Sequence, residues 1–152
     1  IVERIASSEL PTGRGLNQEA NLKRPRDTRR GSHFGTVTSV ISLFSPIISL
    51  MKIIEDDPKN DAARTDVGCI LYAMEDFEFA FLLHLMHLIL GISYELSQAL
   101  QRKYQDLLNA IGLVNVVKSR LQEVKDSDFD ELLQETNLFA NKYDIDIPNM
   151  ED

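Results

Sequence analysis

The sequence predicts an all-α protein: a helical bundle of five or six helices preceded by a basic, poorly ordered N-terminal segment. Apolar residues recur at spacings of three and four along most of residues 34–147, which is the period of an amphipathic helix. The alternation of apolar and polar residues that marks a strand appears nowhere over a useful length. Short turns between these segments are typical of a helical bundle.

Length and composition narrow the class of protein. The chain has 152 residues, of which 43% are hydrophobic and 26% charged. A single domain of this size buries roughly 68–70% of the surface of its unfolded chain. The composition excludes a collagen, a disulfide scaffold and a fully disordered chain. The one cysteine, Cys69, cannot form an internal bridge, which favours a reducing compartment, and we expect it to be a small core residue.

Three regions are expected along the chain. Residues 1–33 form a basic linker, because they contain Pro11, Pro25 and several glycines and show no sustained apolar period. Residues 34–147 form the helical domain, and residues 148–152 form a tail. The chain begins with Ile1 and lacks the apolar run of a secretory signal, so we expect a fragment or a mature piece.

Two helices are expected between residues 34 and 76. Pro46 lies inside the first pattern, and it either kinks the helix or begins a new one with Ser45 as N-cap. A loop at residues 56–60 separates the two patterns. The apolar face of the first pattern comprises Val40, Phe44, Ile47, Ile48, Met51 and Ile54. The apolar face of the second comprises Ala63, Val67, Ile70, Leu71 and Met74.

The third helix, residues 77–90, is apolar nearly all round, as expected for a central helix. We expect Gly91 to end it and Ser93 to cap a short helix through Leu100. The most apolar stretch, residues 77–92, is shorter than the roughly 20 residues of a membrane-spanning helix. It also contains charged and imidazole side chains, so a buried core helix is the favoured interpretation.

Two further helices complete the predicted fold. Ser127 and Asp130 match a capping box at the start of the last one. The first of these helices is marked by Leu107, Ile111, Val114, Val117, Leu121 and Val124. The last is marked by Phe129, Leu132, Leu133, Phe139 and Tyr143.

No catalytic, metal-binding or cofactor-binding residue is predicted. His84 and His87 share one helical face, but a metal site needs further ligands, so we expect them either to pack between helices or to lie at the surface. Glu75, Asp76 and Glu78 are interpreted as charges at a helix start. With no phosphate loop and no pair of nucleophile and base, the chain is not expected to be an enzyme on its own.

A second acidic group imitates the start of a calcium-binding loop. Its members are Asp126, Asp128 and Asp130. Glu131 stands where the loop requires glycine, and Asn137 where it requires a bidentate glutamate. We therefore interpret these acids as charges at a helix N-terminus.

One run of basic residues suggests a binding partner. It comprises Lys23, Arg24, Arg26, Arg29 and Arg30. Residues 1–35 carry a net charge of +3, whereas residues 36–152 carry −11. Such a run can contact phosphate or a nuclear import receptor. The alternative is a solvated leader that balances an acidic body.

A series of short segments follows a characteristic order and spacing. These are GRGLNQE at 13–19, LKRP at 22–25, DTRRGSHF at 27–34, the apolar helix at 77–92, LSQALQRK at 96–103, Arg120-Leu121 and the final helix to Pro148. Together they resemble plant transposase-derived proteins of the hAT superfamily, the zinc finger MYM-type protein 1-like or TTF-type zinc-finger proteins. The resemblance covers nearly the whole chain.

The resemblance implies a place in a larger protein. In that family, three catalytic acids on a ribonuclease-H-like core bind divalent metal, and an all-helical domain is inserted into the core. This sequence resembles the approach to that insertion and much of the insertion itself, without the zinc finger, the catalytic strands or the dimerisation region. The family usually reads Thr-Arg-Trp at the start of the insertion, with the Trp implicated in stacking on a flipped base. Arg29 matches the Arg, and Arg30 replaces the Trp.

The leading hypothesis from the sequence is therefore a nuclear, hAT-type fragment. It would support DNA binding and assembly, contacting DNA weakly through the basic run, and would be catalytically incompetent alone. A helical protein–protein interaction module with no nucleic-acid role is the alternative. A bundle that holds an apolar ligand is a third reading. Protein partners or self-association are open, and no membrane partner or cofactor is expected.

Overall fold

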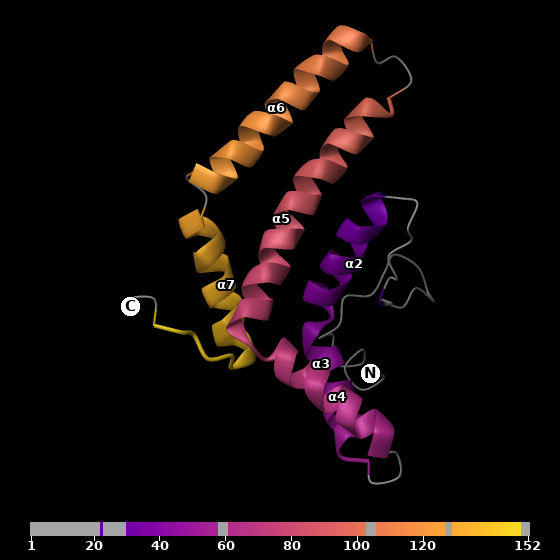
Figure 1. The fold of residues 1–152 in the computed structure, drawn as a ribbon, viewed down its shortest axis with the longest axis vertical. Coiled ribbons are helices and arrows are strands. Elements are labelled where there is room, and N and C mark those ends of the chain that lie inside the picture. The colour runs from indigo at the N-terminus through magenta and orange to yellow at the C-terminus, as the bar shows by residue number, and fades with distance from the viewer. Residues whose placement is uncertain (1–21, 23–29, 58–60, 103–105, 127–128, 150–152) are drawn as a thin grey trace, which may run out of the picture.

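The computed structural model describes Leu22 and residues 30–57, 61–102, 106–126 and 129–149. Within these residues the fold is all-α, as predicted, with six helices and no strand (Figure 1). The order of the N-terminal segment lies outside the described residues. The helices are α2 (Arg30–Ser42), α3 (Phe44–Glu55), α4 (Asp61–Met74), α5 (Phe77–Leu100), α6 (Leu107–Asp126) and α7 (Phe129–Tyr143).

The first predicted helical pattern is divided into two helices. α2 begins at Arg30, ahead of the expected boundary at Phe34, and α2 and α3 meet at an angle of 72°. The break at Leu43 lies three residues before Pro46, and Leu43 rather than Ser45 is the N-cap of α3. Pro46 has no N–H, and its ring clashes with the carbonyl of the residue four positions earlier. A continuous helix is therefore excluded at Ser42, and the proline falls in the first turn of α3, where it is tolerated.

α2 is helical although serine and threonine are frequent in it. Hydroxyl groups along the helix donate to the carbonyl four residues earlier: Thr36 to Ser32, Thr38 to Phe34, Ser39 to Gly35 and Ser42 to Thr38. These bonds satisfy hydroxyls that would otherwise compete for backbone groups. In the same helix, the aromatic ring of Phe34 makes the packing contact with α5.

α5 is one continuous helix of 24 residues, so the predicted break at Gly91 and the separate short helix are wrong. The glycine has a packing role instead. A Cβ built at Gly91 would lie 3.3 Å from Cε2 of Phe34, and the Phe34 ring stacks on His87 and Tyr94 at centroid distances of 5.1 and 5.3 Å. A missing side chain at position 91 lets α2 approach α5, which is why the helix tolerates the lower helix propensity of glycine.

The main core lies where α3, α4, α5 and α7 meet (Figure 1). Phe44 is 1% exposed, and its ring centroid lies 4.8 Å from that of Phe139 and 4.8 Å from that of Tyr143. Ala80 and Ala140 are fully buried and allow α5 and α7 to approach closely. The cluster of buried residues comprises Phe44, Met74, Phe77, Ala80, Phe139, Ala140 and Ile145.

α3 and α4 pack against each other as an arm below this core (Figure 1). Leu71 and Met74 are buried, whereas Ile70 is largely exposed. Cys69 is also exposed, so the prediction of a core cysteine is wrong. It lies about 200° around the helix from the buried Leu71, so its thiol points to solvent. An ion pair of 2.8 Å joins Lys52, in the last turn of α3, to Glu75, which directly follows α4.

The far half of α5 is only partly buried. α6 runs antiparallel beside it and has no buried residue (Figure 1). By length and composition α5 could cross a membrane, with a mean hydropathy of 1.6 over its most apolar window, of which 17% is buried. The bent pair α2 and α3 passes the same test if it is counted as one span. The prediction that this segment is too short to span is wrong, because the helix continues through Gly91, and its burial is partial.

The Phe34–Gly91 contact can be tested with a matched pair of glycine substitutions. Gly91→Leu should lower the free energy of unfolding by about 1–3 kcal/mol, because its side chain enters the space of the Phe34 ring. Gly112→Leu in α6 should raise it by roughly 0.5–1 kcal/mol, because nothing lies within 4 Å of the added Cβ and leucine is the better helix former. Urea unfolding followed by far-UV circular dichroism measures both. Equal effects at the two positions would contradict the proposed packing role.

Candidate functional site

The basic run joins the fold at the N-terminus of α2. Lys23, Arg24, Arg26 and Arg29 lie outside the described residues, and Arg30 is the first residue of α2. The first turn of α2 contains no acidic side chain. The positive end of a helix dipole attracts anions, so this end of α2 adds to the attraction of the basic run for phosphate.

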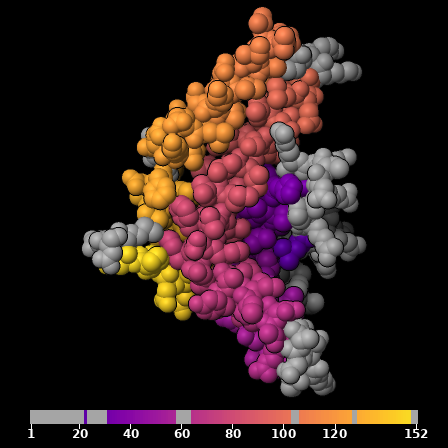
Figure 2. All heavy atoms as spheres, in the orientation of Figure 1, coloured from indigo at the N-terminus to yellow at the C-terminus, as the bar shows by residue number. Residues whose placement is uncertain are grey.

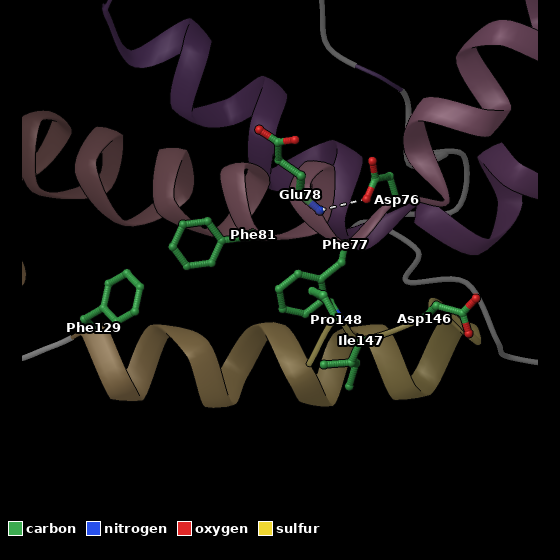
Figure 3. A pocket seen from close by; sticks show the side chains of 8 residues that line it. All are labelled: Asp76, Phe77, Glu78, Phe81, Phe129, Asp146, Ile147 and Pro148. Atoms are coloured by element: carbon green, nitrogen blue, oxygen red, sulfur yellow. Dashed lines mark hydrogen bonds between the residues drawn. The ribbon is translucent and has the colours of Figure 1, made fainter. Parts of the chain in front are cut away.

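A pocket of about 410 Å³ lies between the start of α5, the start of α7 and the C-terminal segment (Figure 3). Phe81 of α5 and Phe129 of α7 face each other at a centroid distance of 5.6 Å and form one wall. Phe77, Ile147 and Pro148 form the other end. The walls are apolar, so the pocket suits an apolar side chain or a small apolar molecule.

The C-terminal wall of this pocket depends on a chain reversal after α7. Asp144 has a φ of 60°, in the left-handed region, and the N–H of Ile145 donates to the carbonyl of Ala140 at 2.9 Å. This is the pattern of a Schellman C-cap, in which a hydrophobic residue follows the left-handed one. Ile145 is buried and anchors the segment so that Ile147 and Pro148 reach the pocket.

Acidic groups near the pocket have structural roles, as predicted. Asp76 is the N-cap of α5 and accepts a hydrogen bond of 3.1 Å from the N–H of Glu78 (Figure 3). Glu78 lies in the first turn of α5, and Glu75 pairs with Lys52. Asp146 is exposed at the rim. Among the described residues that line the pocket, none is a His, Cys or Ser that could act as a nucleophile or base beside these carboxylates.

The second acidic group divides between two helices. Asp130 lies in the first turn of α7, as predicted, whereas Asp126 ends α6 and accepts a hydrogen bond of 2.7 Å from Gln122. The interpretation as N-terminal charges is therefore wrong for Asp126. Asp128 and the Ser127 half of the capping box lie outside the described residues. Among the described residues, no three His, Cys, Asp or Glu side chains converge as a metal site would require.

His84 and His87 pack between helices, which is one of the two roles expected of them. Nδ1 of His84 lies 2.8 Å from the carbonyl oxygen of Ala80, and its ring meets Phe139 of α7 edge to face at 4.8 Å. His87 stacks on Phe34 of α2. Burial lowers the pKa of His87 below its ordinary value of 6.5; the nearby His84 lowers it further, and Glu135 opposes both effects.

Comparison of the chain with protein-family models, with curated proteins and with solved structures gave no match.

The lowered pKa of His87 predicts a dependence of stability on pH. As the pH falls through 6.5, the unfolded chain takes up a proton at position 87 before the folded chain does. The free energy of unfolding should therefore be highest above this value and decrease as the pH falls through the folded pKa. His87→Phe keeps an aromatic ring against Phe34 and removes the titrating group. Urea unfolding at about pH 7.5 and about pH 5.5 should show a smaller loss of stability for this variant than for the original chain. An identical loss would contradict the prediction.

Proposed function

We propose that the chain is part of an hAT-type, transposase-derived protein, and that it forms the helical insertion domain of that protein. In this role it supports DNA binding and assembly in the nucleus and is catalytically incompetent alone. The proposal rests on the direct connection of the basic run to an all-helical domain. Arg30 begins α2, and helices continue from there to Tyr143 within the described residues. A helical domain entered through a Thr-Arg motif is what the resemblance implies.

Charge confines the proposed DNA contact to the N-terminal part of the chain. Residues 36–152 carry −11, so phosphate is repelled by the helical body. Residues 1–35 carry +3, concentrated in the basic run. Contact through a few cations is weak and strongly dependent on salt. In an intact protein, this contact would add to those of other domains.

A second candidate function is a helical protein–protein interaction module. The observation that favours it is the apolar surface of the α5–α6 hairpin, where Leu82, Met86 and Ile111 are each about half exposed. Soluble monomers seldom leave a contiguous apolar surface of this kind uncovered. The two functions are compatible, because the DNA contact and the hairpin use different residues.

Neutralising the basic run tests the proposed DNA contact. A variant with Lys23→Ala, Arg24→Ala, Arg26→Ala and Arg29→Ala should lose nearly all affinity for duplex DNA, and the slope of log affinity against log salt should fall by about three to four units. Fluorescence anisotropy at several salt concentrations measures both. A control with Lys118→Ala and Lys125→Ala removes cations of α6 and should bind as the original chain does. If the control loses as much affinity as the variant, the contact lies on the helical body and the proposal fails.

Arg30→Trp tests the relation to the family at one residue. The change restores the aromatic residue that the resemblance implies, and stacking on a base contributes about 1–3 kcal/mol. It also removes a cation, which should reduce the salt slope by about one unit. Binding should therefore tighten on DNA with an unpaired base at its end and weaken or stay equal on intact duplex. Identical changes on both substrates would show that position 30 is not at a stacking site.

A further inference from the structure

α5 has an apolar stripe on a side that no described helix covers. α2 packs on the side of His87 and Tyr94 through Phe34. α7 packs on the side of Phe81 and His84. In Figure 2, atoms of α5 lie open at the surface between α6 and α2. The stripe, called here the α5 seam, consists of Leu82, Met86, Ile89, Ser93, Leu96 and Leu100.

The spacing of the seam is that of a coiled coil. Its residues follow one another at intervals of four, three, four, three and four. This is the alternation of d and a positions in a heptad repeat, and it keeps one narrow face directed at a partner helix. Leu82, Met86 and Leu100 are 48%, 47% and 37% exposed, and the three seam positions between Met86 and Leu100 are partly exposed, so a partner helix can reach the seam. The repeat covers about 27 Å of helix, at 1.5 Å per residue.

α6 extends the same apolar side. Leu107, Ile111 and Val114 are exposed along one stripe of α6. α6 runs antiparallel to α5, and helical geometry places this stripe on the same side of the hairpin as the α5 seam. The 3.0 Å ion pair between Arg120 and Glu95 lies on the opposite side of the hairpin. On the seam side, the α6 stripe continues at the same spacing to Lys118 and Lys125, whereas the α5 seam itself has no charged residue. The side of the ion pair, called here the charged side, faces away from the seam.

We propose that the α5 seam binds the α5 seam of a second copy of this chain, with the two helices antiparallel. This arrangement pairs position 82 with 100, 86 with 96, and 89 with 93, so that each layer joins an a residue to a d residue. The pairing is the same seen from either copy, as a two-fold dimer requires. Ser93 is the one polar residue of the seam, and its hydroxyl already donates to the carbonyl of Ile89 at 3.0 Å. Burying it leaves no hydroxyl donor unpaired.

Charge and area both fit a second copy. The chain as a whole carries −8, but the seam has no charged residue, so two copies meet there without opposed carboxylates. Six apolar side chains that are about half exposed or more, and two that are less exposed, would cover about 800 Å² in total, which is smaller than a standard specific interface and typical of a weak, transient contact. The dimer should therefore dissociate in the micromolar range.

The proposal goes beyond the DNA contact and does not depend on it, because oligomeric state is measured without DNA. Sedimentation velocity of the full chain over a range of about 1 to 200 μM should show the mass rising from 17.3 kDa towards twice that value. A chain that remains monomeric throughout overturns the proposal. Sedimentation with neutral phosphatidylcholine vesicles by a chain that is monomeric in solution also overturns it, in favour of a lipid surface.

Substitutions on the two sides of the hairpin test the surface. Met86→Glu places a carboxylate in the seam and should shift the dissociation constant at least tenfold towards monomer, with unchanged helical content by circular dichroism. Val116→Glu is the matched control, because Val116 is 64% exposed and lies on the charged side of the hairpin. The control should dimerise as the original chain does. An equal loss of dimer in both variants overturns the proposal.

A mixing experiment tests the antiparallel register and does not depend on the stability of either variant alone. Position 86 is predicted to face position 96 of the second copy, so Met86→Glu and Leu96→Lys should each be monomeric and should form a mixed dimer when combined. The mixed dimer has one ion pair and one original apolar pair at these layers. Failure of the two folded variants to combine overturns the antiparallel seam, whatever the original chain does.

Discussion

The contact between Phe34 and Gly91 is the constraint on which the position of α2 depends. The ring of Phe34 occupies the space that a side chain at position 91 would take, and it stacks on His87 and Tyr94 to either side. A ring held on three sides fixes both the distance and the register of the two helices. As a result, Arg30 begins its helix beside the far half of α5, and the basic run enters the fold at that point.

The extent of burial differs along the molecule, and this difference separates the packed core from the α5 seam. Phe44, Phe139 and Tyr143 close the core at the start of α5, where four helices meet. Further along α5, α2 and α6 are its neighbours among the described helices. The α5 seam lies on a different side of the helix from the rings that pack against α2 and α7, and it is most exposed at Leu82 and Met86. This side is therefore available to a partner.

The two proposed contacts differ in their physical character. Contact with DNA through the basic run is a matter of charge, and its strength falls as salt screens the phosphates. Contact through the α5 seam is apolar, and salt should leave it nearly unchanged or strengthen it slightly. An hAT-type protein with this domain could therefore hold DNA and a second copy at once, because the run precedes α2 and the seam faces away from α2. Changes in salt would then alter DNA occupancy while the dimer persists.

The sequence by itself determined the class of fold and the type of most elements, because the three-and-four spacing of apolar residues is a local property of the chain. It also predicted that Asp76 and Glu78 are helix-start charges. For the two histidines it left a packing role and a surface role open, and the tertiary structure shows that both pack between helices. Tertiary structure decided whether Gly91 ends a helix or makes room for an aromatic ring, because the ring belongs to Phe34, which is distant in sequence. It decided that Cys69 faces solvent, because burial of one side of α4 is set by α3. It also decided that the residues of the α5 seam are open, because a pattern shows which residues share a face and only the packed neighbours show whether that face is covered.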